Sequence, residues 1–239
     1  MIRSLLYVSL APVFIIALYI YIRDKYEKEP VLSLLKALLT GVLIVLPIVF
    51  IEGYTNQLCG SLPSLLNPLF KGFFVASLTE EGFKYFAFIL FFWGSRNFNE
   101  RFDGIVYAVY ISLGFAAVEN VFYVYKGGYE IGLLRALTAV PAHALFGTVM
   151  GFHFGNARFY PDKRKIQLLL AFLMPFTWHG LYDFLLMGQK EILIIFFIPV
   201  FIYFWINGFK KIKELSGTSI FRNDLPEDRA PENDESFES

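Results

Sequence analysis

Three ionisable residues stand within five positions of a strongly apolar region. Glu80, Glu81 and Lys84 lie in the segment SLTEEGFKYF, residues 77–86, with FFVAS leading into the charges and FAFILFFW following them. On a helix Lys84 reaches either carboxylate, because the pairs are three and four positions apart. A salt bridge therefore explains Lys84 and one glutamate. The salt bridge does not explain why the second glutamate is present. We expect Lys84 to pair with Glu81, which leaves Glu80 available for another role.

Other apolar regions carry isolated ionisable residues of complementary chemistry. Glu119 is followed by Asn120, and His179 precedes Asp183 by four positions, so that both lie on one helix face. A further apolar region carries His143. His153 lies further along the same region and is interpreted as structural. Each residue alone has a structural explanation, either a salt bridge or a hydrogen-bonded buried histidine.

The elements that must position these residues are predicted membrane helices. The chain of 239 residues is 56% hydrophobic and 19% aromatic, well above an ordinary soluble domain. An apolar run of about 20 residues crosses roughly 30 Å of hydrocarbon. We predict an all-α polytopic transmembrane bundle of about seven spans, at residues 4–22, 31–51, 71–93, 104–125, 133–155, 166–187 and 192–208.

Lysine and arginine predict the orientation, because they concentrate on the cytoplasmic side of membrane proteins. Fourteen lie in four segments that alternate with the others, namely residues 23–30, 94–103, 156–165 and the C-terminal tail, against three on the opposite side. This distribution predicts an extracytoplasmic N-terminus and a cytoplasmic C-terminus. The acidic, proline-containing tail, residues 214–239, is predicted to be a disordered extension of a membrane domain at 1–213.

With this orientation the ionisable residues fall at similar depths. Counting from the nearer end of each span places Glu80, Glu119, His143 and His179 roughly 9 to 15 Å below the outer surface. A charge at mid-bilayer costs between about 2.5 and 17 kcal/mol, so such residues face the bundle interior and are functional candidates. Four spans therefore contribute to one polar site near the outer face.

The residue types suit the activation of water. A buried carboxylate beside a like charge can serve as a general base, and a histidine can donate to an oxyanion. Histidine and carboxylates also bind Zn²⁺, but the HExxH spacing is absent from the sequence. Glycines at 147, 151 and 155 repeat every four residues and predict close helix packing beside the site. Cys59 is single and is interpreted as a bystander thiol.

Four motifs on successive spans resemble those of the PrsW family of membrane-embedded proteases, which is related to the type II CAAX prenyl endopeptidases. They are EEGFK at 80–84, FAAVE at 115–119, HALFG at 143–147 and HGLYD at 179–183. The segments IRDKYEKEP and MGFHFGNARF add to the likeness, which covers about residues 1–213 and leaves out the acidic tail.

The resemblance implies a bacterial cell-membrane endopeptidase that makes the site-1 cut, on the extracytoplasmic side, in a single-span membrane-anchored anti-sigma factor. The cut starts a cascade of regulated intramembrane proteolysis that releases an ECF sigma factor in a stress response. By likeness, Glu80 would activate the water, with Glu81 beside it among the catalytic residues. Glu119 stands where the prenyl endopeptidases carry a histidine and would serve as co-base or as proton acceptor. His179 would stabilise the oxyanion, and Asp183 would orient His179. His143 would complete the polar cluster, and Lys84 would be the charge partner of a glutamate.

We favour a glutamate-type mechanism without metal or other cofactor, with zinc as the alternative. Two other functions compete with the protease. A proton-coupled transporter would use the same intramembrane glutamate, histidine and lysine residues, although the sequence lacks the repeated halves common in transporters. A non-catalytic receptor or scaffold would use the polar cluster to recognise helices, but it has no need of paired carboxylates.

Overall fold

The computed structural model describes residues 2–58, 63, 66–188 and 191–222. Cys59 and most of the acidic tail lie outside the described residues, so the predictions made for them stay predictions. The described chain is helical, with no strand in these ranges. Its elements are α1 (Ile2–Arg23), α2 (Val31–Leu58), α3 (Leu66–Phe70), η2 (Lys71–Ser77), α4 (Leu78–Phe91), α5 (Arg101–Leu137), α6 (Ala139–Phe159), η3 (Pro161–Lys163), α7 (Arg164–Met187) and α8 (Glu191–Gly217).

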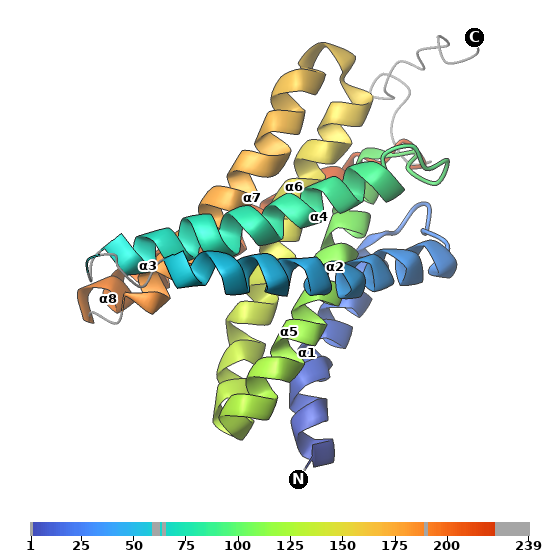
Figure 1. The fold of residues 1–239 in the computed structure, drawn as a ribbon. Coiled ribbons are helices and arrows are strands. Elements are labelled where there is room, and N and C mark those ends of the chain that lie inside the picture. Colours follow the sequence, from blue (N-terminus) through green and yellow to red (C-terminus); the bar gives the residue numbers. More distant parts are fainter. Residues whose placement is uncertain (1, 59–62, 64–65, 189–190, 223–239) are drawn as a thin grey trace.

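Helix α5 is the centre of the bundle. It packs against α1, α2 and α6, and α7 and α8 complete the far side of α6. In Figure 1, α2 and α4 run side by side across the α5–α6 pair. Every residue of α5 from Phe102 to Ala116 is buried, whereas large apolar side chains such as Leu32, Phe50 and Leu90 are 75–79% exposed on the outer helices. A bundle with an apolar exterior of this kind suits a lipid environment.

Glycines allow α5 and α6 to approach closely. A Cβ atom on Gly151 would collide with the backbone of Gly104, and one on Gly155 with the backbone of Arg101. Between α2 and α5, a Cβ on Gly41 would collide with the carbonyl of Ile111, and one on Gly114 with the carbonyl of Leu38. The predicted packing role of the glycine repeat is confirmed, since small residues let membrane helices approach through their backbones.

Five stretches of described helix are long and apolar enough to cross a membrane, at residues 5–23, 31–57, 101–159, 161–187 and 191–217. The 59-residue stretch contains two predicted spans, and the helix kinks between them at Gly128, whose φ is 78°. The span predicted at residues 71–93 folds as helix from 71 to 91 but is not among the five, and it carries the three charges of the EEGFK motif. The all-helical membrane fold is confirmed; the count of seven and the orientation stay predictions.

The segments rich in lysine and arginine meet at one end of the bundle. Arg101 donates to the hydroxyls of Tyr160 and Thr218, each at 2.7 Å. At the same end Ser216 donates to the carbonyl of Arg23 at 2.7 Å, and Arg158 to that of Trp93 at 2.6 Å. All four predicted cytoplasmic segments are thus neighbours in space, as they must be if they share one side of the membrane.

Candidate active site

Helix α4 turns its ionisable side chains into the bundle. Atom Nζ of Lys84 lies 2.7 Å from Oε1 of Glu81 and 3.2 Å from Oε2 of Glu80. The side chains of Lys84 and Glu81 are fully buried, and that of Glu80 is 6% exposed. The closer partner of Lys84 is Glu81, as expected from the sequence, which leaves Glu80 as the less engaged carboxylate.

A π-helical segment, η2, leads directly into α4 and seats it against α7. Gly72 of η2 lies so close to Gly180 of α7 that an added Cβ would meet backbone atoms at about 3.0 Å. The hydroxyl of Ser77 donates to the carbonyl of Phe176 at 2.5 Å. Wide π turns often accompany functional sites. Here the close contact brings the start of α4 opposite His179, one position before Gly180.

The imidazole of His179 connects α4 with α7. Its Nδ1 lies 2.9 Å from Oε1 of Glu81, and its Nε2 lies 3.4 Å from Oδ2 of Asp183. Ionised carboxylates only accept hydrogen bonds, so both ring nitrogens act as donors between them and the ring carries a positive charge. Phe146 stacks on this ring with the centroids 5.0 Å apart. His179 is thereby fixed in plane and direction, with Asp183 one turn further along.

His143 of α6 lies at right angles to His179, with 5.4 Å between the ring centroids. Its Nδ1 is 3.3 Å from Nζ of Lys84, and its Nε2 is 2.9 Å from Oε2 of Glu119. An ammonium group only donates, so Nδ1 accepts and Nε2 holds the proton that it donates to Glu119. The two histidines thus differ in state, His143 as a neutral ring and His179 as a cation.

Arg135, near the end of α5, holds Glu119 from the other side. Its Nη2 lies 2.8 Å from Oε2 of Glu119, and its Nε donates to Oδ1 of Asn120 at 2.9 Å. Asn120 in turn donates to the backbone carbonyl of Ser9 in α1 at 2.8 Å. The guanidinium also lies over the ring of Tyr123, 4.0 Å from its centroid. The kink at Gly128 folds the end of α5 back far enough to make these contacts.

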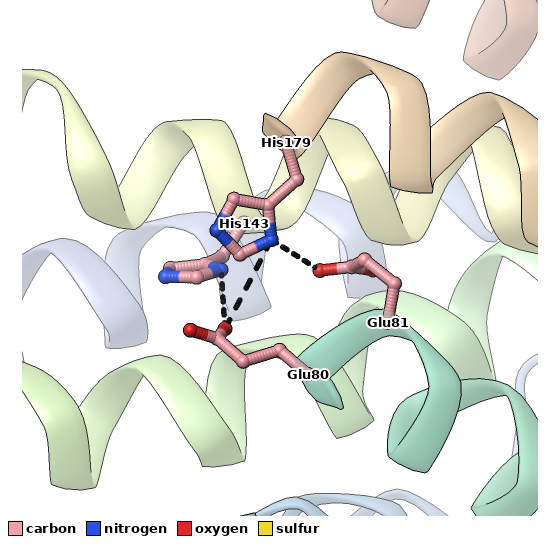
Figure 2. Close-up of side chains that lie close together, drawn as sticks. All are labelled: Glu80, Glu81, His143 and His179. Carbon is pink, nitrogen blue, oxygen red and sulfur yellow. Dashed lines mark hydrogen bonds and ion pairs between the residues drawn. The ribbon is translucent and has the colours of Figure 1, made fainter. Parts of the chain in front are cut away.

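Glu80 is the group around which the others gather. Figure 2 shows its carboxylate facing both imidazoles, and its Oε2 is 4.0 Å from Nδ1 of His143 and 4.0 Å from Nδ1 of His179. The site becomes more exposed on one side, where the side chains of Glu119 and Asp183 are 21% and 15% exposed. All seven predicted site residues therefore belong to one connected cluster: Glu80, Glu81, Lys84, Glu119, His143, His179 and Asp183.

Two charged residues of this cluster were not singled out from the sequence. Arg135 lies two positions inside a predicted span, and Glu52 directly follows the end of another. Glu52 of α2 faces the site from a further side, where Glu80, Glu119, His179 and Asp183 are its electrostatic neighbours, and its Oε1 is buried without a partner. Their depth in the membrane could have identified them, because Arg135 and Glu52 both lie near the predicted outer ends of their spans. His153, predicted to be structural, pairs instead with Gln167 at 2.7 Å.

The cluster has the donors of a metal site as well as those of an acid–base site. One ligand atom from each of Glu80, Glu81, His143 and His179 lies within 4.8 Å of the others. Two imidazole nitrogens and two carboxylate oxygens suit Zn²⁺. The ammonium of Lys84, however, already lies between 2.7 and 3.3 Å from Glu81, Glu80 and His143. A metal ion held by these donors would compete with Lys84 for them.

A helical membrane bundle with buried glutamates, histidines and a lysine at one site defines a membrane-embedded protein of either hydrolytic or proton-transfer chemistry. Comparison with known proteins decides between them. The family described as PrsW family intramembrane metalloprotease matches residues 29–206. The chain belongs to the PrsW family and is a multi-pass bacterial membrane peptidase. The transporter and scaffold alternatives lose their support.

Curated relatives named Protease PrsW match over nearly the whole chain. That of Geobacillus kaustophilus is 39% identical over 90% of this chain and 93% of its own length. That of Oceanobacillus iheyensis is 37% identical over 91% and 98%, and that of Bacillus subtilis 34% over 90% and 96%. No solved structure matches this fold.

Proposed function

We propose that the protein makes the site-1 cut, on the extracytoplasmic side, in a single-span membrane-anchored anti-sigma factor, and so starts the release of an ECF sigma factor. The proposal is supported by the likeness to the PrsW proteases and by the chemistry of the site. The observation that carries the catalytic part is the position of Glu80, 4.0 Å from each of two imidazoles of different state.

In the proposed reaction Glu80 is the general base. It takes a proton from a water molecule that lies between it and the two imidazoles, while the hydroxide attacks the scissile carbonyl carbon. The Nε2–H of the cationic His179, whose contact with Asp183 is the longer one at 3.4 Å, turns to donate a hydrogen bond to the oxyanion that forms, while Glu81 holds Nδ1 at 2.9 Å. When the C–N bond breaks, the proton on Glu80 passes to the departing nitrogen. The products are a new carboxyl terminus and a new amine.

The other charges prepare the site for this step. Lys84 offsets the charge of Glu81 in a fully buried pair at 2.7 Å, and its contact with Glu80 is the longer one, at 3.2 Å. His143 keeps its proton on the side of Glu119, which Arg135 also holds. Glu119 therefore serves as an anchor for His143 and as a reserve proton acceptor. Glu80, Glu81, His143 and His179 are the residues that would hold a divalent metal, which would supply Lewis-acid chemistry to the carbonyl group and the water.

The location of the site favours a cut near the outer face. Glu119 lies 18 residues along α5 from Arg101, about 27 Å at 1.5 Å per residue. Arg101 belongs to the end of the bundle where the lysine- and arginine-rich segments meet. If that end is cytoplasmic, the site opens toward the opposite surface, where the extracytoplasmic part of a single-span substrate is within reach.

Reconstitution with candidate substrates tests the proposal. The purified full-length protein is combined in liposomes with single-span anti-sigma factors, and the fragments are identified by mass spectrometry. We expect one primary cut on the extracytoplasmic side of the substrate helix, and none with Glu80→Gln. Cleavage by Glu80→Gln at the wild-type rate would refute the assigned base. Cleavage confined to the cytoplasmic part of the substrate would refute the site-1 role.

A further inference from the structure

A second group of acidic residues lies at the opposite end of α5 from the active site. Asp24, Glu27 and Glu29 come from the connection between α1 and α2, Glu100 from the residue before α5, and Asp103 from its first turn. Asp103 and Glu119 are 16 positions apart on α5, about 24 Å. The group therefore takes no direct part in peptide cleavage, and the proposed function does not explain it.

Three of these carboxylates converge. One oxygen from each of Asp24, Glu100 and Asp103 lies within 4.8 Å of the others. The residues are 1%, 3% and 0% exposed. A second triad, formed by Glu27, Glu29 and Asp103, shares Asp103 with the first. Three carboxylates this close and this buried need a positive charge or protons among them.

Each of the three carboxylates is engaged by backbone on one oxygen only. Oδ2 of Asp24 accepts from the N–H of Glu29 at 2.9 Å, and Oδ2 of Asp103 accepts from that of Glu100 at 2.7 Å. Glu100 accepts from the N–H of Asp103 in a capping box. The remaining oxygens are buried and have no hydrogen-bond partner: Oδ1 of Asp24, Oε2 of Glu100 and Oδ1 of Asp103. These oxygens lie on three converging carboxylates and have no hydrogen-bond donor among the described residues. A bound cation would satisfy them, as buried polar atoms require.

Nearby basic side chains do not fill this role. Among the described residues no ion pair within 4.0 Å involves any of the five carboxylates. Lys28 is close in sequence, but its ammonium donates to the backbone carbonyls of Tyr21 and Asp24 at 2.7 and 3.0 Å. The cluster is thus short of positive charge in its present contacts.

We propose that Asp24, Glu100 and Asp103 bind a divalent cation of the hard class, Mg²⁺ or Ca²⁺. The available donors are all oxygens, which these ions prefer, whereas Zn²⁺ favours nitrogen and sulfur. The side-chain oxygen of Asn99, also buried and unpartnered, lies next to Glu100 in the chain and is a further available donor. The cation ties the α1–α2 connection to the start of α5, and so fixes the end of the central helix that carries Glu119.

The geometry distinguishes this site from the catalytic cluster. The catalytic donors include His143 and His179, and Lys84 supplies a charge among them. The acidic triad contains no imidazole, and among the described residues no lysine lies within 4.0 Å of its carboxylates as an ion pair. Titrating a hard cation into variants of the acidic triad and, separately, into variants of the catalytic cluster therefore shows which of the two sites binds it.

The test uses the full-length protein in detergent micelles after removal of metals with a chelator. Mn²⁺ binding is followed by electron paramagnetic resonance, with Mg²⁺ and Ca²⁺ as competitors, and the melting temperature is measured with and without Mg²⁺. We expect one saturable site that Mg²⁺ or Ca²⁺ competes for, retained in Glu81→Gln and in the matched surface control Glu214→Gln. Asp24→Asn and Glu100→Gln are expected to weaken Mn²⁺ binding by about tenfold or more.

The amide variants keep the size of each side chain, so a folding defect is not expected to hide the result. Mn²⁺ binding and a Mg²⁺-dependent melting temperature that persist unchanged in Asp24→Asn and Glu100→Gln would overturn the proposal. The wild-type protein also tests it without any variant. If it shows no saturable site that hard cations compete for, the carboxylates share protons instead and the proposal fails.

Discussion

Arg135 and Glu119 form an ion pair of 2.8 Å across the kink of α5, although 16 positions of chain separate them. The same oxygen of Glu119 lies 2.9 Å from His143. The pair therefore couples the folded-back end of α5 to the histidine that faces Glu80. Arg135 is located in the sequence like a charge that flanks a membrane span. In the structure it holds Glu119, and through Glu119 it helps to position His143.

Replacing Arg135 tests this coupling. Arg135→Lys keeps the charge but cannot contact Glu119 and Asn120 together, because lysine lacks the guanidinium's second donor. We expect kcat to fall about ten- to a hundredfold with little change in KM, as for other groups that orient a site from behind it. Lys126→Arg, at a position with no role in the site, is the matched control. Unchanged kcat in Arg135→Lys would show that the pair serves structure only.

The paired glutamates of α4 are expected to differ when replaced singly. Glu80→Gln removes the base and abolishes cleavage, while Lys84 and His179 keep their contacts with Glu81. Glu81→Gln leaves a buried ammonium with its weaker partner and costs about 1–3 kcal/mol of stability besides activity. Thermal unfolding and cleavage measured on both variants check the difference. A larger loss of stability in Glu80→Gln than in Glu81→Gln would contradict the assignment of Lys84 to Glu81.

Sequence reasoning located the core of the site because intramembrane charges are rare and helical spacing restricts their partners. Spacing alone predicts the local pair of His179 with Asp183 and places Lys84 within reach of both Glu80 and Glu81. The sequence did not identify Arg135 and Glu52 as site residues, because a charge near the end of an apolar run is ordinary at a membrane surface. Their roles depend on the kink at Gly128 and on the packing of α2, which are tertiary features. The π-helical turn before α4 also has no signature in the sequence.

Gly151 offers a test of the packing that supports the site. A Cβ at this position collides with the backbone of Gly104, which cannot move without separating α5 from α6. We expect Gly151→Val to destabilise the protein by about 3 kcal/mol or more and to reduce its level in the membrane. Gly53→Ala is the matched control, since nothing lies within 4 Å of its added Cβ. That change is expected to leave stability unchanged or raise it by up to about 1 kcal/mol. Equal stability of Gly151→Val and wild type would contradict the close α5–α6 contact.

The position of Lys84 leads to a prediction about metal dependence. Its ammonium lies 3.3 Å from His143 and within 3.2 Å of both glutamates, where it supplies the positive charge that a zinc ion would otherwise bring. We therefore expect cleavage to persist after treatment with a zinc-selective chelator, which leaves Mg²⁺ and Ca²⁺ at the acidic site undisturbed. Lys84→Met removes the competing charge and is expected to raise the affinity for Zn²⁺ at least tenfold, measured by equilibrium dialysis, while cleavage falls. Loss of wild-type activity on chelation and its recovery with stoichiometric Zn²⁺ would establish the metal mechanism instead, with Glu80, Glu81, His143 and His179 as the available ligands.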